Sequence, residues 1–201
     1  MTSSIIQFGD NEGSLATSVF PFPELVASCI SEIESRACLT VRPPITIYGK
    51  DCRQPRSVGF FSKGISSFDY SRGNHLPAIN IQDNSVMDQL LETVNRLRLS
   101  HKQQFNGILV NRYDGGNDYV AAHSDKQHIE QNEDVWSVSW GETRLFRIRD
   151  KKTKNIVFDL PLTQGVLCEM NGNFQSRYTH EIVKEPKKKG IRYSFTFRRH
   201  L

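Results

Sequence analysis

The sequence predicts a mainly β fold, a β-sandwich or jelly roll, with two helices packed outside it. After residue 105 the chain is a series of short β-prone segments separated by turn signals. Before residue 105, two stretches instead carry apolar residues at helical spacing. Six or seven strands with regular turns, preceded by two amphipathic helices, are typical of an α+β chain in which β structure dominates.

Size and charge restrict the class of protein further. A chain of 201 residues can bury one sizeable core, so we expect a single domain over residues 23–201, preceded by a flexible arm over 1–22 that is rich in small and polar residues. The net charge of +4 permits an anionic partner without requiring one. No apolar run could cross a bilayer, and the N-terminus lacks a secretory signal. We therefore expect an intracellular protein, nuclear or cytoplasmic, that is monomeric, has no membrane partner and keeps its four cysteines as free thiols.

The first helix is expected to begin at Pro23, because proline suits the first turn and an apolar stripe follows it. The second is expected after Ser85, a good N-cap residue. The two stripes consist of Leu25, Val26, Cys29, Ile30 and Ile33, and of Val86, Leu90, Leu91, Val94 and Leu97. Between the helices, residues 45–48 and 58–61 are expected as strands.

The remaining strands are expected where β-prone residues lie between turns such as DGGND, KKTKN, NGN and EPKKKG. They cover residues 106–113, 135–140, 143–149, 156–160, 165–170, 177–183 and 191–199.

The last of these strands, IRYSFTFR, alternates strictly. Ile191, Tyr193, Phe195 and Phe197 share one face, while Arg192, Ser194, Thr196 and Arg198 share the other. The polar face either meets water or lines the interior of a barrel, and the strand alone does not distinguish the two.

Two histidines and one aspartate are a candidate metal site. His123 and Asp125 lie at i and i+2 on an extended segment, so their side chains share a face, and His180 lies on another predicted strand. Two imidazoles and one carboxylate form the facial triad of non-haem Fe(II) oxygenases, which leaves positions open for a cosubstrate and O₂. The pattern HxD is weak by itself, because a single surface histidine is common. The other four histidines, His75, His101, His128 and His200, are expected to be ordinary.

A cosubstrate with two carboxylates would suit the other polar side chains. Asn111 and Tyr113 share one face of a strand, and Arg192 and Arg198 offer planar forks for carboxylates. The strings NRYDGGNDYVAAHSD, SVSWGETRLFRIR and RYSFTFR, with His180 between the last two, resemble the AlkB family of Fe(II)- and 2-oxoglutarate-dependent oxygenases. This resemblance covers residues 40–200.

The resemblance implies a double-stranded β-helix over residues 105–200, a nucleotide-recognition lid over 45–75, and catalysis by the metal triad with Arg198. It implies that His123, Asp125 and His180 bind Fe(II), and that Asn111 and Tyr113 contact 2-oxoglutarate. Arg198 would pair with the carboxylate nearer the metal, and Arg192 with the distal one. Thr196 would assist, and Ser194 stands where the family usually has Asn.

By the same resemblance, 2-oxoglutarate and O₂ are consumed, with ascorbate as a reductant in vitro, to hydroxylate N-alkyl groups of damaged bases. Bases such as 1-methyladenine and 3-methylcytosine, in DNA or RNA, would be restored with release of formaldehyde, succinate and CO₂. Such an enzyme must take the base out of its stack.

Several residues match the family's substrate contacts. Phe68 and Tyr70 correspond to aromatics of the lid, although core packing would also explain them. Arg56 would lie near the base pocket, and Ile47 with Tyr48 match an apolar finger that probes the base stack. Gln127 replaces an acidic residue that often faces the exocyclic amine of a cationic base.

The lysines at 151, 152 and 154 and at 187–189 could hold phosphates, although lysines in surface turns are usually only solvated. Two other functions stay open. One is a protein or small-molecule hydroxylase on the same scaffold, because fold and metal site do not fix the substrate. The other is a module that binds modified bases without turnover.

Overall fold

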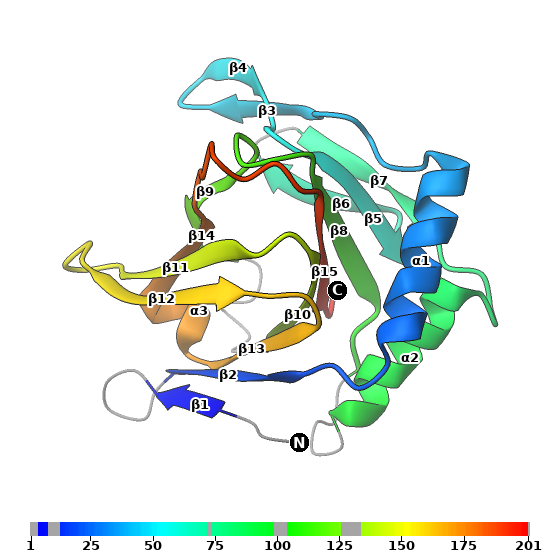
Figure 1. The fold of residues 1–201 in the computed structure, drawn as a ribbon. Helices are drawn as coiled ribbons and strands as arrows, with labels where there is room; N and C mark the ends of the chain where they lie inside the picture. Colours follow the sequence, from blue (N-terminus) through cyan, green and yellow to red (C-terminus); the bar gives the residue numbers. More distant parts are fainter. Residues whose placement is uncertain (1–3, 8–12, 72–73, 99–103, 126–133, 201) are drawn as a thin grey trace. The chain divides into compact units, whose positions relative to one another are not determined.

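The computed structural model describes residues 4–7, 13–71, 74–98, 104–125 and 134–200 (Figure 1). The chain forms two compact units. One contains residues 1–20 and 113–194, and the other contains residues 21–112 and 195–201. The single domain expected over 23–201 stays a prediction; within that range the two units meet in the sequence after residues 112 and 194.

The first unit contains two antiparallel groups of strands. One has the order β1 (Ser4–Gln7), β2 (Gly13–Val19), β13 (Val166–Gly172) and β10 (Val135–Gly141). The other has the order β12 (Ile156–Leu162), β11 (Arg144–Asp150), β14 (Tyr178–Ile182) and β9 (Val120–His123). A short helix, α3 (Phe174–Arg177), lies between β13 and β14 in the chain.

Buried side chains from both groups of strands form one core in this unit. Leu15, Val135 and Met170 come from the first group, and Phe146 and Ile182 come from the second. Two antiparallel sheets that share a core in this way are the arrangement expected of a sandwich or jelly roll.

The N-terminal segment differs from the flexible arm expected over residues 1–22. Gly13–Val19 is strand β2, which pairs in register with β13, and Leu15 is fully buried. The composition of this segment suggested a loop, but a single strand needs only a few inward-facing apolar residues to join a sheet. Leu15 and Phe20 supply them here.

The second unit contains both long helices and a further group of strands. β5 (Ser57–Ser62) pairs antiparallel with β8 (Gly107–Tyr113) and parallel with β7 (Asn74–Asn80), which in turn pairs with β6 (Ser67–Ser71). Every residue of β5 is buried. The last strand, β15 (Arg192–Arg198), begins in the first unit and ends in the second.

Both predicted helices are confirmed. α1 spans Pro23–Arg36 with proline in its first turn. α2 spans Val86–Leu97, and the Ser85 side chain accepts a hydrogen bond from the backbone N–H of Asp88 at 3.2 Å. The two helices lie side by side within this unit (Figure 1). Their buried residues belong to the apolar stripes expected from the sequence, with Met87 and Asp88 in addition.

A two-stranded hairpin, β3 (Pro44–Ile47) and β4 (Lys50–Arg53), also belongs to the second unit. Its two-residue turn is Tyr48-Gly49, and both residues have positive φ, +49° and +76°. Tyr48 at this tip is fully exposed, and Ile47 beside it is half-exposed.

Candidate functional site

Strands β9 and β14 bring the two histidines of the predicted triad together. The two strands are antiparallel neighbours, and His123 lies directly opposite His180 in their register. Opposed side chains on such a pair project to the same face. The two imidazole rings have centroids 4.4 Å apart.

Asp125 completes the cluster from the segment that follows β9. Its Oδ1 lies 3.8 Å from Nε2 of His123, and the nearest ligand atoms of the three residues all lie within 4.8 Å of one another. The Asp125 side chain is only 10% exposed, whereas that of His123 is 40% exposed. The predicted triad is therefore assembled, with its open side at His123.

The surroundings of the histidines fix their orientation. Nδ1 of His123 lies 2.9 Å from the backbone oxygen of Ala121, so this nitrogen carries the proton and Nε2 keeps a lone pair for a metal. His180 is buried, and its ring packs against those of Phe146 and Phe174, with centroid separations of 5.4 and 6.1 Å. This donor set suits Fe(II) or a similar divalent metal.

Arg192, at the start of β15, is a buried cation whose hydrogen-bonding capacity is only partly used. It is 1% exposed, and Nη2 donates to the Ser139 hydroxyl at 3.0 Å. Its Nε and Nη1 have no hydrogen-bond partner among the described residues. The guanidinium carbon lies 5.0 Å from the centre of the Tyr113 ring. Burial lowers the pKa of Arg192, an effect that the neighbouring Tyr113 partly opposes. These donors fit an anion such as a carboxylate.

All seven residues of β15 are buried, so the polar face of this strand does not meet bulk water. Ser194 and Thr196 are 6% and 9% exposed, and Arg198 is 5% exposed. Ile191, which was expected on the apolar packed face, is instead 45% exposed because the strand begins only at Arg192.

Two predicted site residues of the second unit contact each other. Nε of Arg56 donates to Oδ1 of Asn111 at 2.7 Å, and Asn111 is 6% exposed. Because the amide oxygen accepts this bond, the NH₂ group of Asn111 is directed to other partners.

The predicted lid residue Phe68 is half-buried in the same unit. Its ring packs against Phe60 at 5.4 Å and edge-on against His200 at 5.6 Å, and the Arg198 guanidinium lies 5.7 Å from its centre. Core packing therefore explains part of the position of Phe68. Tyr70 belongs to β6, but its side chain lies outside the described residues, as does Gln127.

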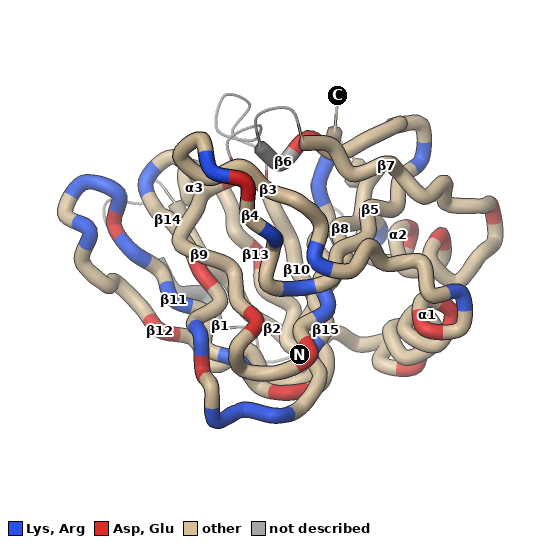
Figure 2. Tube along the Cα trace, turned by 90° about the horizontal axis from the view of Figure 1, so that it is seen from above, with Lys and Arg blue, Asp and Glu red and all other residues tan. Residues whose placement is uncertain are grey.

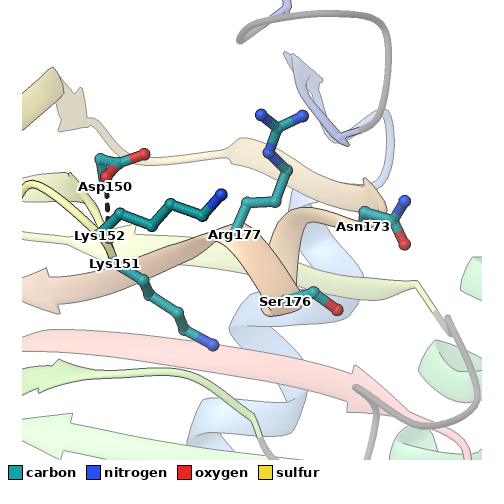
Figure 3. A pocket seen from close by; sticks show the side chains of 6 residues that line it. All are labelled: Asp150, Lys151, Lys152, Asn173, Ser176 and Arg177. Carbon is teal, nitrogen blue, oxygen red and sulfur yellow. Dashed lines mark hydrogen bonds between the residues drawn. The ribbon is translucent and has the colours of Figure 1, made fainter.

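A cavity of about 360 Å³ lies at the turn between β11 and β12, next to α3, and cations dominate its lining. Lys152 and Arg177 extend to the same side of the ribbon, and Lys151 extends to the other (Figure 3). The carboxylate of Asp150 accepts hydrogen bonds from the backbone N–H groups of Lys152 and Thr153, at 2.8 and 2.7 Å. The turn itself carries the basic residues at 151, 152 and 154 (blue in Figure 2).

The second lysine cluster, at 187–189, is partly used within the protein. Lys188 pairs with Glu142 at 3.2 Å, and Lys189 donates to the backbone oxygen of Pro186. In the first cluster, Lys151 likewise donates to the backbone oxygen of Gln175, so both clusters are partly used within the protein.

Three residues with prominent contacts were missed by the sequence analysis. Gln175 contacts Asp125, and Ser139 contacts Arg192. Arg144, 1% exposed, pairs with Glu185 at 3.1 Å. It also donates to the backbone oxygens of Gly115 and Asp118, before β9, and of Val183, directly after β14. No spacing rule marks such residues, because their partners are distant in the sequence.

Comparison with known proteins agrees with this geometry. Residues 23–198 match the model of the 2OG-Fe(II) oxygenase superfamily, and the chain belongs to that superfamily. Members of this family use Fe(II) and 2-oxoglutarate, for which the His-Asp-His cluster is suited. Its relatives place it, more narrowly, in the AlkB family.

Two relatives define this placement. The chain is 29% identical over 181 residues to the DNA oxidative demethylase ALKBH2 of Arabidopsis thaliana, covering 78% of this chain and 57% of the relative. It is 30% identical over 156 residues to the alpha-ketoglutarate-dependent dioxygenase alkB homolog 3 of Homo sapiens, covering 73% and 52%. The chain thus spans about half the length of these curated relatives.

Solved structures support the fold class. A structure of OsALKBH1 has a TM-score of 0.60 at 16% identity, covering 96% of this chain and 100% of that one. A prolyl-4-hydroxylase of Pseudomonas putida has a TM-score of 0.54 at 13% identity, covering 93% of each. The predicted mainly β jelly-roll class is confirmed, although at this identity the likeness concerns the fold alone. Among the described residues, no helix has the length and apolar character needed to span a membrane.

Proposed function

We propose that this protein is an AlkB-type dioxygenase that removes alkyl groups from N-alkylated bases, such as 1-methyladenine and 3-methylcytosine, in DNA or RNA. The observation that carries the proposal is the cluster of His123, Asp125 and His180 on paired elements of one unit. The name of one relative, the DNA oxidative demethylase ALKBH2, supports this choice of substrate class.

His123, Asp125 and His180 would hold Fe(II). When bound, Fe(II) together with 2-oxoglutarate and O₂ supplies the oxidation of a C–H bond on the N-alkyl group. The hydroxylated group would then leave as formaldehyde, restoring the base, while 2-oxoglutarate is converted to succinate and CO₂. The fixed proton on Nδ1 of His123 keeps Nε2 available as a ligand.

Arg192 would bind the distal carboxylate of 2-oxoglutarate through its Nε and Nη1 donors, beside Tyr113. Arg198 would pair with the carboxylate nearer the metal. Asn111, with its oxygen engaged by Arg56, would offer its NH₂ group, and Thr196 and Ser194 would add hydroxyl donors. A buried cation with unmet donors supports an anionic cosubstrate, because such donors are costly when nothing binds them.

The substrate would be held by residues of two kinds. Phe68 and Tyr70 would stack on the extracted base, and the exposed Tyr48 at the hairpin tip would probe the base stack. Lys152 and Arg177, which line the cavity beside α3, would bind backbone phosphates.

The test is mass spectrometry of oligonucleotides that carry one 1-methyladenine or 3-methylcytosine, offered as DNA and RNA, single- and double-stranded, with Fe(II), ascorbate and 2-oxoglutarate. We expect the oligonucleotide to lose about 14 mass units only when 2-oxoglutarate is present, because replacing an N-methyl group by hydrogen removes a net CH₂. Consumption of 2-oxoglutarate without any loss of mass would instead favour a hydroxylase acting on proteins or small molecules. No consumption at all would leave a module that only binds modified bases.

A further inference from the structure

The short helix α3 lies against the metal ligands, and one of its side chains contacts a ligand directly. Gln175 is 2% exposed, and its Oε1 accepts a hydrogen bond from the backbone N–H of Asp125 at 3.0 Å. Asp125 follows the end of β9 and does not belong to a strand. The Gln175 side chain thus ties the Asp125 backbone to α3.

The orientation of the Gln175 amide follows from its partners. The backbone N–H of Asp125 can only donate, so the amide oxygen must face it, and the NH₂ group then faces the sulfur of Met170 at 3.5 Å. The contact with the sulfur lies inside the core, because Met170 belongs to the buried cluster of this unit. The Gln175 amide is therefore held through both its oxygen and its nitrogen before any metal binds.

The backbone of Gln175 is held as well. Its carbonyl oxygen accepts a hydrogen bond from Nζ of Lys151, on the turn between β11 and β12. Phe174, its neighbour on α3, packs against the ring of His180. The same turn of helix therefore supports two of the three ligands, one through a hydrogen bond and one through ring packing.

We propose that Gln175 is a positioning residue for the metal centre. It holds the main chain at Asp125 so that the carboxylate faces His123 and His180 before the metal arrives. A metal-binding side chain that becomes ordered only on binding lowers the affinity for the metal. Groups that orient such side chains typically raise the metal affinity by about 10- to 100-fold. This inference rests on the proposed metal site, and it adds a residue that neither the sequence motif nor the family's triad includes.

The test measures the affinity for Co(II) alone, from its d–d absorption, in protein first stripped of metal with EDTA. Gln175→Met keeps the volume of the side chain and removes the accepting oxygen, so Co(II) should bind about 10- to 100-fold more weakly. Gln175→Glu keeps an acceptor at the same place and should restore most of the affinity. Met170→Leu is the matched control: it alters the other contact of the same amide without touching Asp125, and should leave Co(II) affinity within about twofold.

Urea unfolding of each metal-free variant separates positioning from general loss of stability. The inference is overturned if Gln175→Met binds Co(II) as tightly as the wild type, or if Met170→Leu lowers the affinity equally. It is also overturned if Gln175→Glu binds as weakly as Gln175→Met. If Gln175→Met does not fold, Gln175→Glu is compared with the wild type instead, and a loss of about 10-fold or more in Co(II) affinity overturns the inference. A wild-type protein that binds Co(II) but dealkylates no base would refute the proposed function alone, whereas one that binds no Co(II) would refute both.

Discussion

Replacing Arg192 by methionine should stabilise the protein without its cosubstrate and, at the same time, abolish binding of 2-oxoglutarate. Arg192 is 1% exposed and is the most nearly buried cation of β15. Two of its donors, Nε and Nη1, meet no acceptor within the described part of the chain. A residue with these properties costs stability in the free protein and gains its partners only on binding.

The magnitude follows from the contacts. Each buried unmet donor costs about 1–3 kcal/mol, so removing two gains about 2–6 kcal/mol. Against this, the bond to Ser139 at 3.0 Å and the contact with the Tyr113 ring contribute about 1–3 kcal/mol together. At the middle of each range, about 4 against about 2 kcal/mol, the variant should be more stable by about 2 kcal/mol. Two lost charge-assisted bonds to a carboxylate, at about 1.5–3 kcal/mol each, correspond to an affinity for 2-oxoglutarate lower by about 10²- to 10⁴-fold.

Two measurements check this pair of effects. Urea unfolding of the metal-free protein gives the change in stability, and a thermal shift of the Co(II)-loaded protein on adding 2-oxoglutarate gives the change in binding. At a 2-oxoglutarate concentration of 100 times Kd the wild type should gain about 2.7 kcal/mol, and the variant almost nothing. Arg147→Met is the matched control, because Arg147 forms a partly exposed ion pair with Asp159 at 2.8 Å. It should change stability by less than about 1 kcal/mol and leave 2-oxoglutarate binding intact.

The reasoning is refuted if Arg192→Met loses 2 kcal/mol or more of stability, at the scale of a broken buried contact. It is equally refuted if the variant keeps the thermal shift caused by 2-oxoglutarate. Arg192→Lys should have an affinity for 2-oxoglutarate between those of the wild type and Arg192→Met, since lysine keeps the charge but lacks the planar fork.

Other contacts give further predictions. Arg144→Met should lower the free energy of unfolding by about 3–5 kcal/mol in urea, because it leaves its acidic partner and several backbone oxygens without a donor; a loss under 1 kcal/mol would contradict this. Burial raises the pKa of Asp88, but hydrogen bonds from Lys63 and the Asn84 N–H outweigh it and the pKa is lowered from 3.8. A carboxyl whose pKa is lowered by folding stabilises the fold at pH values above its pKa in the unfolded chain, and this stabilisation is lost as the pH falls. Asp88→Asn should therefore make the free energy of unfolding depend less on pH below about pH 4. An unchanged pH dependence in that range would contradict this. Lys152→Ala with Arg177→Ala should lower the slope of log affinity for DNA against log salt by about 1–2, while an unchanged slope would exclude phosphate contact in that cavity.

The helices and the candidate metal ligands could be predicted because each leaves a local trace. Apolar spacing and a capping serine define α2, and His123 with Asp125 fall on one face of an extended segment. The pairing of His180 with His123 is a property of strand register, which the sequence does not display. Gln175 was not predictable for the same reason, since its partner Asp125 is 50 residues away.

Strand β15 shows how far alternation alone can be taken. The pattern predicts that Arg192 and Arg198 share one face, but a polar face could equally have met water. Only the structure shows that both faces are buried. The strand β2 was overlooked for the opposite reason, because one fully buried residue, Leu15, among small polar neighbours gives almost no periodic signal.

The residues proposed to bind ligands are of two physical kinds, and variants should separate them. The proposed metal ligands each have a contact that would orient them: His123 with a backbone oxygen, His180 with aromatic rings, and Asp125 with Gln175. Removing such support should weaken metal binding, and stability should fall or stay level. Arg192 is instead left with unmet donors that an anion would complete, so its removal should weaken binding while stability rises. Residues that only hold the fold, such as Arg144, should lower stability whichever ligand is present. The direction of the stability change, measured beside each affinity, therefore assigns a residue to one kind without reference to activity.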